Sequence, residues 1–156
     1  MVLARLRESL RGRVVIVGVG NPLRGDDGFG PYMIQRLRGR VEVALFDCGS
    51  APENYMGPIR CERPGTILVL DAADFNADPG EVKVFDSSQW RGEGLSTHNV
   101  SLGLFADFLT SDTGAQVFLI AVQAKCIGFG QPMSPEVKEG CRKLQQGLLS
   151  LLGRND

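Results

Sequence analysis

Short apolar runs of strand length alternate along this chain with segments that have the apolar spacing of a helix. Continuous apolar runs rich in β-branched residues are typical of strands that are buried on both faces of a sheet. The segments that fit a strand are Val14–Val17, Val41–Phe46, Thr66–Leu70 and Val117–Val122. The segments with helical spacing are Pro31–Arg38, Asn99–Leu109 and Pro135–Leu152. This alternation predicts a layered α/β fold.

Three further segments have weaker patterns. Glu81–Phe85 alternates polar and apolar residues after an Asp-Pro-Gly turn, which predicts an edge strand antiparallel to its neighbours. Ala51–Arg60 is ambiguous, and a short helix is one interpretation of it. Leu3, Leu6 and Leu10 would line one face of a short N-terminal helix, for which we favour packing over partner binding.

Length and charge limit the classes of protein to consider. The 156 residues fit one domain covering residues 1–156, because a domain commonly has about 100–200 residues. The formal net charge of -1 gives no reason to expect a nucleic acid partner. No apolar run approaches the ~20 residues of a membrane helix, and no signal peptide cleavage site follows the basic start. We therefore expect a cytoplasmic protein with no membrane partner, and a monomer by default.

The four cysteines give no sign of a metal or redox motif. Cys48, Cys61, Cys126 and Cys141 form no C-x-x-C pair, which argues against a zinc ribbon or a redox dithiol. We expect reduced thiols that are mostly buried. A reactive thiolate requires positive surroundings, whereas Cys48 follows Asp47, so Cys48 is predicted to be a packing residue. A serine nucleophile also lacks support, because no G-x-S-x-G motif is present.

Polar residues follow several of the predicted strands. Asp26 and Asp27 come after the first strand, Asp47 after the second and Asp71 after the third. His98, the single histidine of the chain, precedes the helix before the last strand. In open parallel sheets the ligand crevice lies beyond the carboxyl ends of the strands, so these residues are expected on one rim. This convergence predicts a functional site.

Each of these residues also has a purely structural interpretation. A carboxylate just before a helix can cap its free N–H groups, and one aspartate suffices for that role. We assign the cap to Asp26, which leaves Asp27 for the crevice. Asp71 could start a turn, although other aspartates nearby already supply turn residues. His98 could be a solvent-facing loop residue beside a helix cap.

The segment Gly18–Gly30, GVGNPLRGDDGFG, invites a dinucleotide-binding interpretation with Asp47 as the ribose ligand. The fingerprint fails because its third glycine position holds Leu23. Two adjacent aspartates would also place negative charge where a pyrophosphate sits. Histidine with two carboxylates instead suits a borderline divalent metal such as nickel, zinc or cobalt. Three protein ligands leave a position open for water or substrate, as metal-assisted hydrolysis requires.

Five ordered blocks of the chain resemble one known family, the [NiFe]-hydrogenase maturation endopeptidases. The blocks are GVGNPLRGDDGFG, DCGSAPEN (Asp47–Asn54), LVLDAADF (Leu68–Phe75) with PGE (Pro79–Glu81), THN (Thr97–Asn99) and GFGQPMSPEVKE (Gly128–Glu139). The likeness runs from about Val14 to Leu149. SAPEN and the last block look most like the branch that processes the large subunit of formate-hydrogenlyase-type hydrogenase.

The resemblance implies a three-layer α/β/α sandwich with a mostly parallel, mixed five-stranded sheet. Such enzymes remove a C-terminal extension from the hydrogenase large-subunit precursor after nickel has been inserted. The family's nickel-recognition residues match Asp27, Asp71 and His98, which would bind the nickel that the substrate carries. The metal would then be a signal that the precursor is ready. Cys48 stands where glycine is common in the family, and Asp27 stands where glutamate also occurs.

Two functions from other classes remain open. A self-contained metallohydrolase would hold its own zinc or nickel, and a stoichiometric metal that resists chelators would favour it. A non-catalytic nickel or nucleotide carrier would bind its ligand tightly without any proteolysis.

Overall fold

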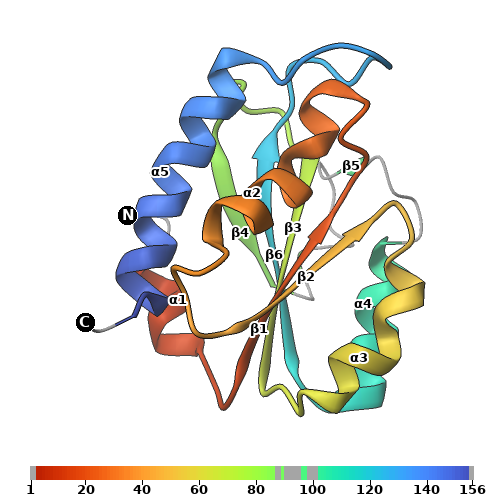
Figure 1. The fold of residues 1–156 in the computed structure, drawn as a ribbon, viewed down its shortest axis with the longest axis vertical. Coiled ribbons are helices and arrows are strands. Elements are labelled where there is room, and N and C mark those ends of the chain that lie inside the picture. Colours follow the sequence, from red (N-terminus) through yellow and green to blue (C-terminus); the bar gives the residue numbers. More distant parts are fainter. Residues whose placement is uncertain (1–2, 87–88, 90–95, 98–101, 155–156) are drawn as a thin grey trace.

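The computed structural model describes residues 3–86, 89, 96–97 and 102–154, and Figure 1 shows their arrangement. The strands are β1 (Val14–Val19), β2 (Ala44–Gly49), β3 (Thr66–Asp74), β4 (Val82–Phe85), β5 (Ser96–Thr97) and β6 (Gln116–Gln123). The α-helices are α1 (Ala4–Ser9), α2 (Phe29–Leu37), α3 (Met56–Cys61), α4 (Leu102–Thr113) and α5 (Pro135–Leu152). Two short 3-10 turns, η1 (Gly25–Gly28) and η2 (Pro52–Tyr55), lead into α2 and α3.

The sheet is mixed and mostly parallel, as predicted. Its main path has the strand order β2-β1-β3-β6-β4. The pairs β1–β2, β1–β3 and β3–β6 are parallel, whereas β4 runs antiparallel to β6 at one edge. The two-residue strand β5 adds to the end of β3 in antiparallel orientation. The predicted antiparallel edge strand is therefore confirmed.

Helices cover both faces of this sheet. Successive side chains of a strand point to opposite faces, so each central strand contributes to two cores. In β3, Leu68 and Leu70 pack in the core formed with α1, α2 and α5, whereas Ile67 and Val69 pack in the core formed with α3 and α4. Figure 1 shows α2 and α5 on one side of the sheet and α3 and α4 on the other. The expected three-layer sandwich is confirmed.

The helices lie close to their predicted positions. α5 coincides with the predicted helix, and the Ser134 hydroxyl caps it by accepting a hydrogen bond from the Val137 N–H at 3.3 Å. α2 begins two residues earlier than predicted, at the fully buried Phe29. The ambiguous segment Ala51–Arg60 contains η2 and most of α3, so its helical interpretation is correct.

The second strand is shifted from its predicted position. β2 begins at Ala44 rather than Val41, and it continues through Asp47 to Gly49. Val41 instead forms an isolated antiparallel bridge with Gly153, the residue after α5. Asp47 is therefore inside β2, and its prediction as a residue beyond the strand is wrong.

The third strand is longer than predicted. β3 continues past Leu70 to Asp74, because β6 pairs with it as far as Ala73 and β5 pairs with its last two residues. Asp71 is paired in register with Ala121 of β6. The prediction that Asp71 terminates the strand is therefore wrong, since β3 continues three residues beyond it, although the pairing with β1 ends at Leu70.

The first residues of the chain pack against the sheet. Leu3 precedes α1 and Leu6 lies within it, and they are 4% and 3% exposed. Both belong to the core formed with α2 and α5, and Leu10 packs against that core while partly buried. The predicted packing role of these leucines is confirmed. Within the described residues, no helix combines the length and the apolar character that a membrane crossing requires.

Candidate functional site

Asp27 lies in η1, where the chain turns from β1 into α2. Its side chain is only 3% exposed, and its Oδ2 accepts a hydrogen bond from the Asn21 N–H at 2.9 Å. Its other oxygen, Oδ1, is buried and has no hydrogen-bond partner among the described residues. Buried carboxylate oxygens are almost always paired, because an unpaired one loses its hydration without compensation. Asp27 Oδ1 is therefore a candidate for binding a ligand.

Asp71 approaches the same place from β3. It is fully buried, and its Oδ1 accepts a hydrogen bond from the Ala72 N–H at 2.9 Å. Gly20, directly after β1, lies between the two aspartates: a Cβ there would be 1.9 Å from the Asp27 carbonyl oxygen and 3.6 Å from Asp71 Oδ1. With φ at +139° and no room for a side chain, this position requires glycine. Gly20 thus adjoins both the backbone of Asp27 and the carboxylate of Asp71, so both residues lie at the same end of β1.

A second glycine allows the start of α2 to pack closely against the sheet. A Cβ on Gly30 would lie 2.4 Å from the carbonyl oxygen of Val19 and 2.5 Å from that of Leu70. The helix can approach the end of β1 and Leu70 of β3 this closely only because the side chain is missing. The turn that carries Asp27 is thereby held over the carboxyl edge of the sheet.

His98, the third predicted site residue, lies outside the described residues. β5 brings Thr97, the residue that precedes it in the sequence, opposite Ala73, two residues from Asp71 along β3. Among the residues that the structure describes, no three His, Cys, Asp or Glu side chains are grouped so that they could hold one metal ion. Because His98 is outside it, the described part of the chain contains two of the three predicted ligands, Asp27 and Asp71.

Asp26 is fully buried and binds the loop that follows β6. Its Oδ2 accepts hydrogen bonds from the Lys125 N–H at 2.8 Å, the Cys126 N–H at 3.0 Å and the Ser134 hydroxyl at 3.0 Å. Its Oδ1 accepts another from the Ser134 N–H at 2.7 Å. Four donors from three residues thus compensate for the burial of this carboxylate.

The prediction that Asp26 caps α2 is wrong. The N-cap residue of α2 is Gly28, and it forms no side-chain cap. The carboxylate of Asp26 is used instead by donors about a hundred residues away in the sequence. The only sequence signal in that region is the Ser-Pro-Glu start of α5, which indicates where the helix begins and not what Ser134 binds.

The loops after β1 and β6, residues 20–28 and 124–134, are joined along their length, and we call them together the paired rim. The Asp26 N–H donates to the Cys126 carbonyl at 2.8 Å, and the Gly130 N–H donates to the Leu23 carbonyl at 2.7 Å. Figure 1 shows the blue loop after β6 beside the first turn of α2. These hydrogen bonds make the two loops one structural unit next to Asp27.

A hollow of 360 Å³ opens beside the paired rim. Its walls include Pro22 and Met133 from the two loops, Tyr32 from α2 and Asp47 from β2. The Asp47 Oδ1 accepts a hydrogen bond from the Gly49 N–H at 3.2 Å. Asp47 was also expected on the rim from the sequence, and it lines this hollow. Asp27 and Asp71 are not among the lining residues.

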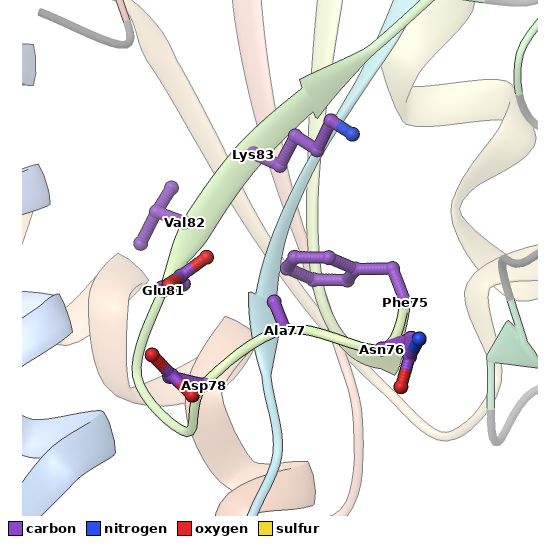
Figure 2. Close-up of a pocket in the computed structure, with 7 residues that line it drawn as sticks. All are labelled: Phe75, Asn76, Ala77, Asp78, Glu81, Val82 and Lys83. Carbon is purple, nitrogen blue, oxygen red and sulfur yellow. The ribbon is translucent and has the colours of Figure 1, made fainter.

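Another hollow, of 590 Å³, lies at the turn between β3 and β4. Figure 2 shows that its lining comes from the turn that follows β3 and from the start of β4. Gln123 of β6 holds the turn, since its Oε1 accepts hydrogen bonds from the Phe75 N–H at 2.8 Å and the Ala77 N–H at 3.2 Å. The carboxylates in this hollow, Asp78 and Glu81, are separate from the Asp27–Asp71 pair.

Two of the four cysteines, Cys48 and Cys141, are buried thiols with a raised pKa. Cys48 is 3% exposed, and its burial, with a smaller effect of Asp47, raises the pKa of its thiol to about 12. Burial likewise raises the pKa of Cys141 to about 12. The predicted packing role of Cys48 is confirmed. All four thiols are free, but Cys61 is exposed and Cys126 half-buried, so the prediction of mostly buried thiols is correct for only two.

Comparisons with known proteins agree on one family. A family model described as HycI, hydrogenase maturation protease, matches residues 31–151. The hydrogenase 3 maturation protease of Escherichia coli K12 is 34% identical over 137 residues, which cover 86% of this chain and 87% of that protein. The chain belongs to the hydrogenase maturation protease family. It is a peptidase, as the resemblance of the sequence blocks implies.

Solved structures of hydrogenase maturation proteases have the same fold. The HycI protease of Thermococcus kodakarensis KOD1 superimposes with a TM-score of 0.86 at 32% identity, covering 96% of this chain and 99% of that one. The endopeptidase HycI of Escherichia coli gives a TM-score of 0.80 at 31% identity, covering 89% and 90% of the two chains. Both the predicted fold and the family resemblance are confirmed.

Proposed function

We propose that this hydrogenase maturation protease removes the C-terminal extension of a [NiFe]-hydrogenase large-subunit precursor that already carries nickel. Asp27, Asp71 and His98 bind that nickel in this proposal. The observation that carries it is the buried aspartate pair: Asp27 and Asp71 are 3% and 0% exposed, they adjoin Gly20, and Asp27 Oδ1 lacks a partner among the described residues. Carboxylate and imidazole groups are suitable ligands for nickel.

A cation is the natural complement of this pair. Burial of a carboxylate removes the water that would stabilise its charge. A metal ion that contacts both carboxylates offsets this cost. The position of β5 supports the third ligand, because it brings Thr97, next to His98 in the sequence, near Asp71 in the register of β3.

The nickel belongs to the substrate, so cleavage depends on whether the precursor has already received its metal. Three protein ligands leave coordination positions open, which the ligands of nickel in the precursor can fill. Nickel then bridges enzyme and precursor, so a nickel-free precursor lacks part of the binding energy. Once held, the metal can polarise the scissile carbonyl or activate a water. In this proposal the enzyme acts as a monomer in the cytoplasm.

The test is to incubate the protein with large-subunit precursor, with and without nickel, and to follow the loss of the extension by mass spectrometry. We expect release only from the nickel-loaded form. Equal cleavage of both forms would contradict nickel recognition. A stoichiometric metal in the purified protease that survives chelation would favour a resident-metal hydrolase instead.

Substitutions test the residue assignment in the same assay. Asp27→Ala, Asp71→Ala and His98→Ala should each abolish release of the extension, while circular dichroism shows a folded protein. Asp78→Ala is the matched control, because Asp78 is an aspartate at the turn between β3 and β4, outside the pair. Normal rates in the three site variants would show that these residues are not the nickel ligands.

A further inference from the structure

Four large apolar side chains stand out from the surface in the described part of the chain. Leu23 is 62% exposed and Phe129 is 75% exposed, and both belong to the paired rim. Leu104 and Phe108, 56% and 55% exposed, lie on α4 on the other side of the sheet from α2 and α5. The fold thus offers two leucine–phenylalanine pairs of similar exposure in different places.

Leu23 and Phe129 are far apart in the sequence but lie on adjoining backbones. The Gly130 N–H, one residue after Phe129, donates to the Leu23 carbonyl at 2.7 Å. The Arg24 Nε donates to the Ile127 carbonyl at 3.3 Å, which adds a second link between the loops. The four hydrogen bonds to the buried Asp26 carboxylate anchor the same two loops. The apolar pair is therefore presented on a preorganised backbone, which lowers the entropy cost of binding.

The position of Leu23 and Phe129 indicates which kind of partner covers them. The backbone of Leu23 is two residues from Asn21, whose N–H binds the Asp27 carboxylate. Because Asp27 and Asp71 are buried, substrate groups must reach inward to them. The rim next to Asp27 then faces the protein from which these groups emerge. On the function proposed above, that protein is the folded large subunit around its nickel.

We propose that Leu23 and Phe129 dock onto the folded body of the large-subunit precursor. Their side chains project from the rim, so a complementary surface needs depressions, which a folded protein provides and an extended peptide does not. The concave hollow beside the rim, with Pro22 and Met133 in its walls, is better suited to the C-terminal extension itself. Apolar and aromatic side chains inserted into a partner commonly carry much of the binding energy of an interface.

The test compares two double variants with nickel-loaded precursor as substrate. For Leu23→Ser with Phe129→Ser we expect kcat/KM to fall about tenfold or more through KM, with kcat within about twofold of normal. The matched control is Leu104→Ser with Phe108→Ser, which should leave both constants unchanged. An unchanged KM in the rim variant, or an equal loss in the α4 variant, would overturn the docking proposal.

A second arm separates the body of the precursor from its extension. A synthetic peptide of the extension is added as a competitor to the wild-type protein and to the rim variant. We expect either no inhibition of either protein or the same inhibition constant for both once their different KM values are taken into account, because the peptide does not contact the pair. A larger inhibition constant for the rim variant would overturn the assignment to the folded body. If the wild-type protein releases no extension from any precursor, the proposed function itself fails, whereas an unaffected rim variant refutes only the docking pair.

Discussion

Asp26→Ala should be strongly destabilising, although this residue contacts no substrate in the proposed mechanism. The substitution removes the acceptor of four hydrogen bonds, from Lys125, Cys126 and Ser134, in a fully buried position. A hydrogen bond to a charged group contributes roughly 1.5–3 kcal/mol, but the four share one acceptor and are not additive. The desolvation cost of the carboxylate also disappears with it. We expect the free energy of unfolding to fall by about 3–5 kcal/mol.

Urea denaturation measures this loss as a lower midpoint of unfolding. Asp112→Ala is the matched control, since Asp112 pairs with Arg60 at 3.1 Å on the surface, with side chains 32% and 59% exposed. An exposed pair of this kind contributes at most about 1 kcal/mol. Limited proteolysis gives a second measurement, because cleavage within residues 124–134 should accelerate in Asp26→Ala and not in the control. A loss for Asp26→Ala no larger than that for Asp112→Ala would refute the reasoning.

Two further predictions concern the thiols and Gly20. At pH 8, thiol reagents should modify the exposed Cys61 rapidly, but Cys48 and Cys141 only after unfolding, because a pKa near 12 leaves about one thiolate in 10⁴. Folding raises the pKa of these two thiols from 9.0 to about 12. Because the unfolded chain loses their protons first, the free energy of unfolding should decline as the pH rises from about 9 to about 12. Rapid labelling of native Cys48 would contradict its burial. Gly20→Ala should destabilise the protein and abolish release of the extension, because the new Cβ would lie 1.9 Å from the Asp27 carbonyl oxygen. Normal melting and activity in that variant would contradict the close approach at Gly20.

The sequence by itself determined the layered architecture and the main candidates for chemistry. A strand buried on both faces must be apolar throughout, and a helix on a sheet needs an apolar stripe, so burial leaves a readable pattern. This pattern places α5 at Pro135–Leu152 and identifies β4 as an antiparallel edge strand. It also points to Asp27 and Asp71, because both follow apolar runs that end at the same edge of a parallel sheet.

Tertiary structure alone decided how far the strands extend and what the buried aspartates bind. Asp71 lies within β3 because β6 and β5 pair beyond the apolar run, and periodicity reports burial rather than the length of a partner strand. Asp26 and Asp27 are neighbours of the same residue type, so no local signal separates them. Asp26 meets four donors from the loop after β6, whereas Asp27 keeps an oxygen without a partner among the described residues. The difference arises from contacts between segments distant in the chain, which local sequence patterns do not encode.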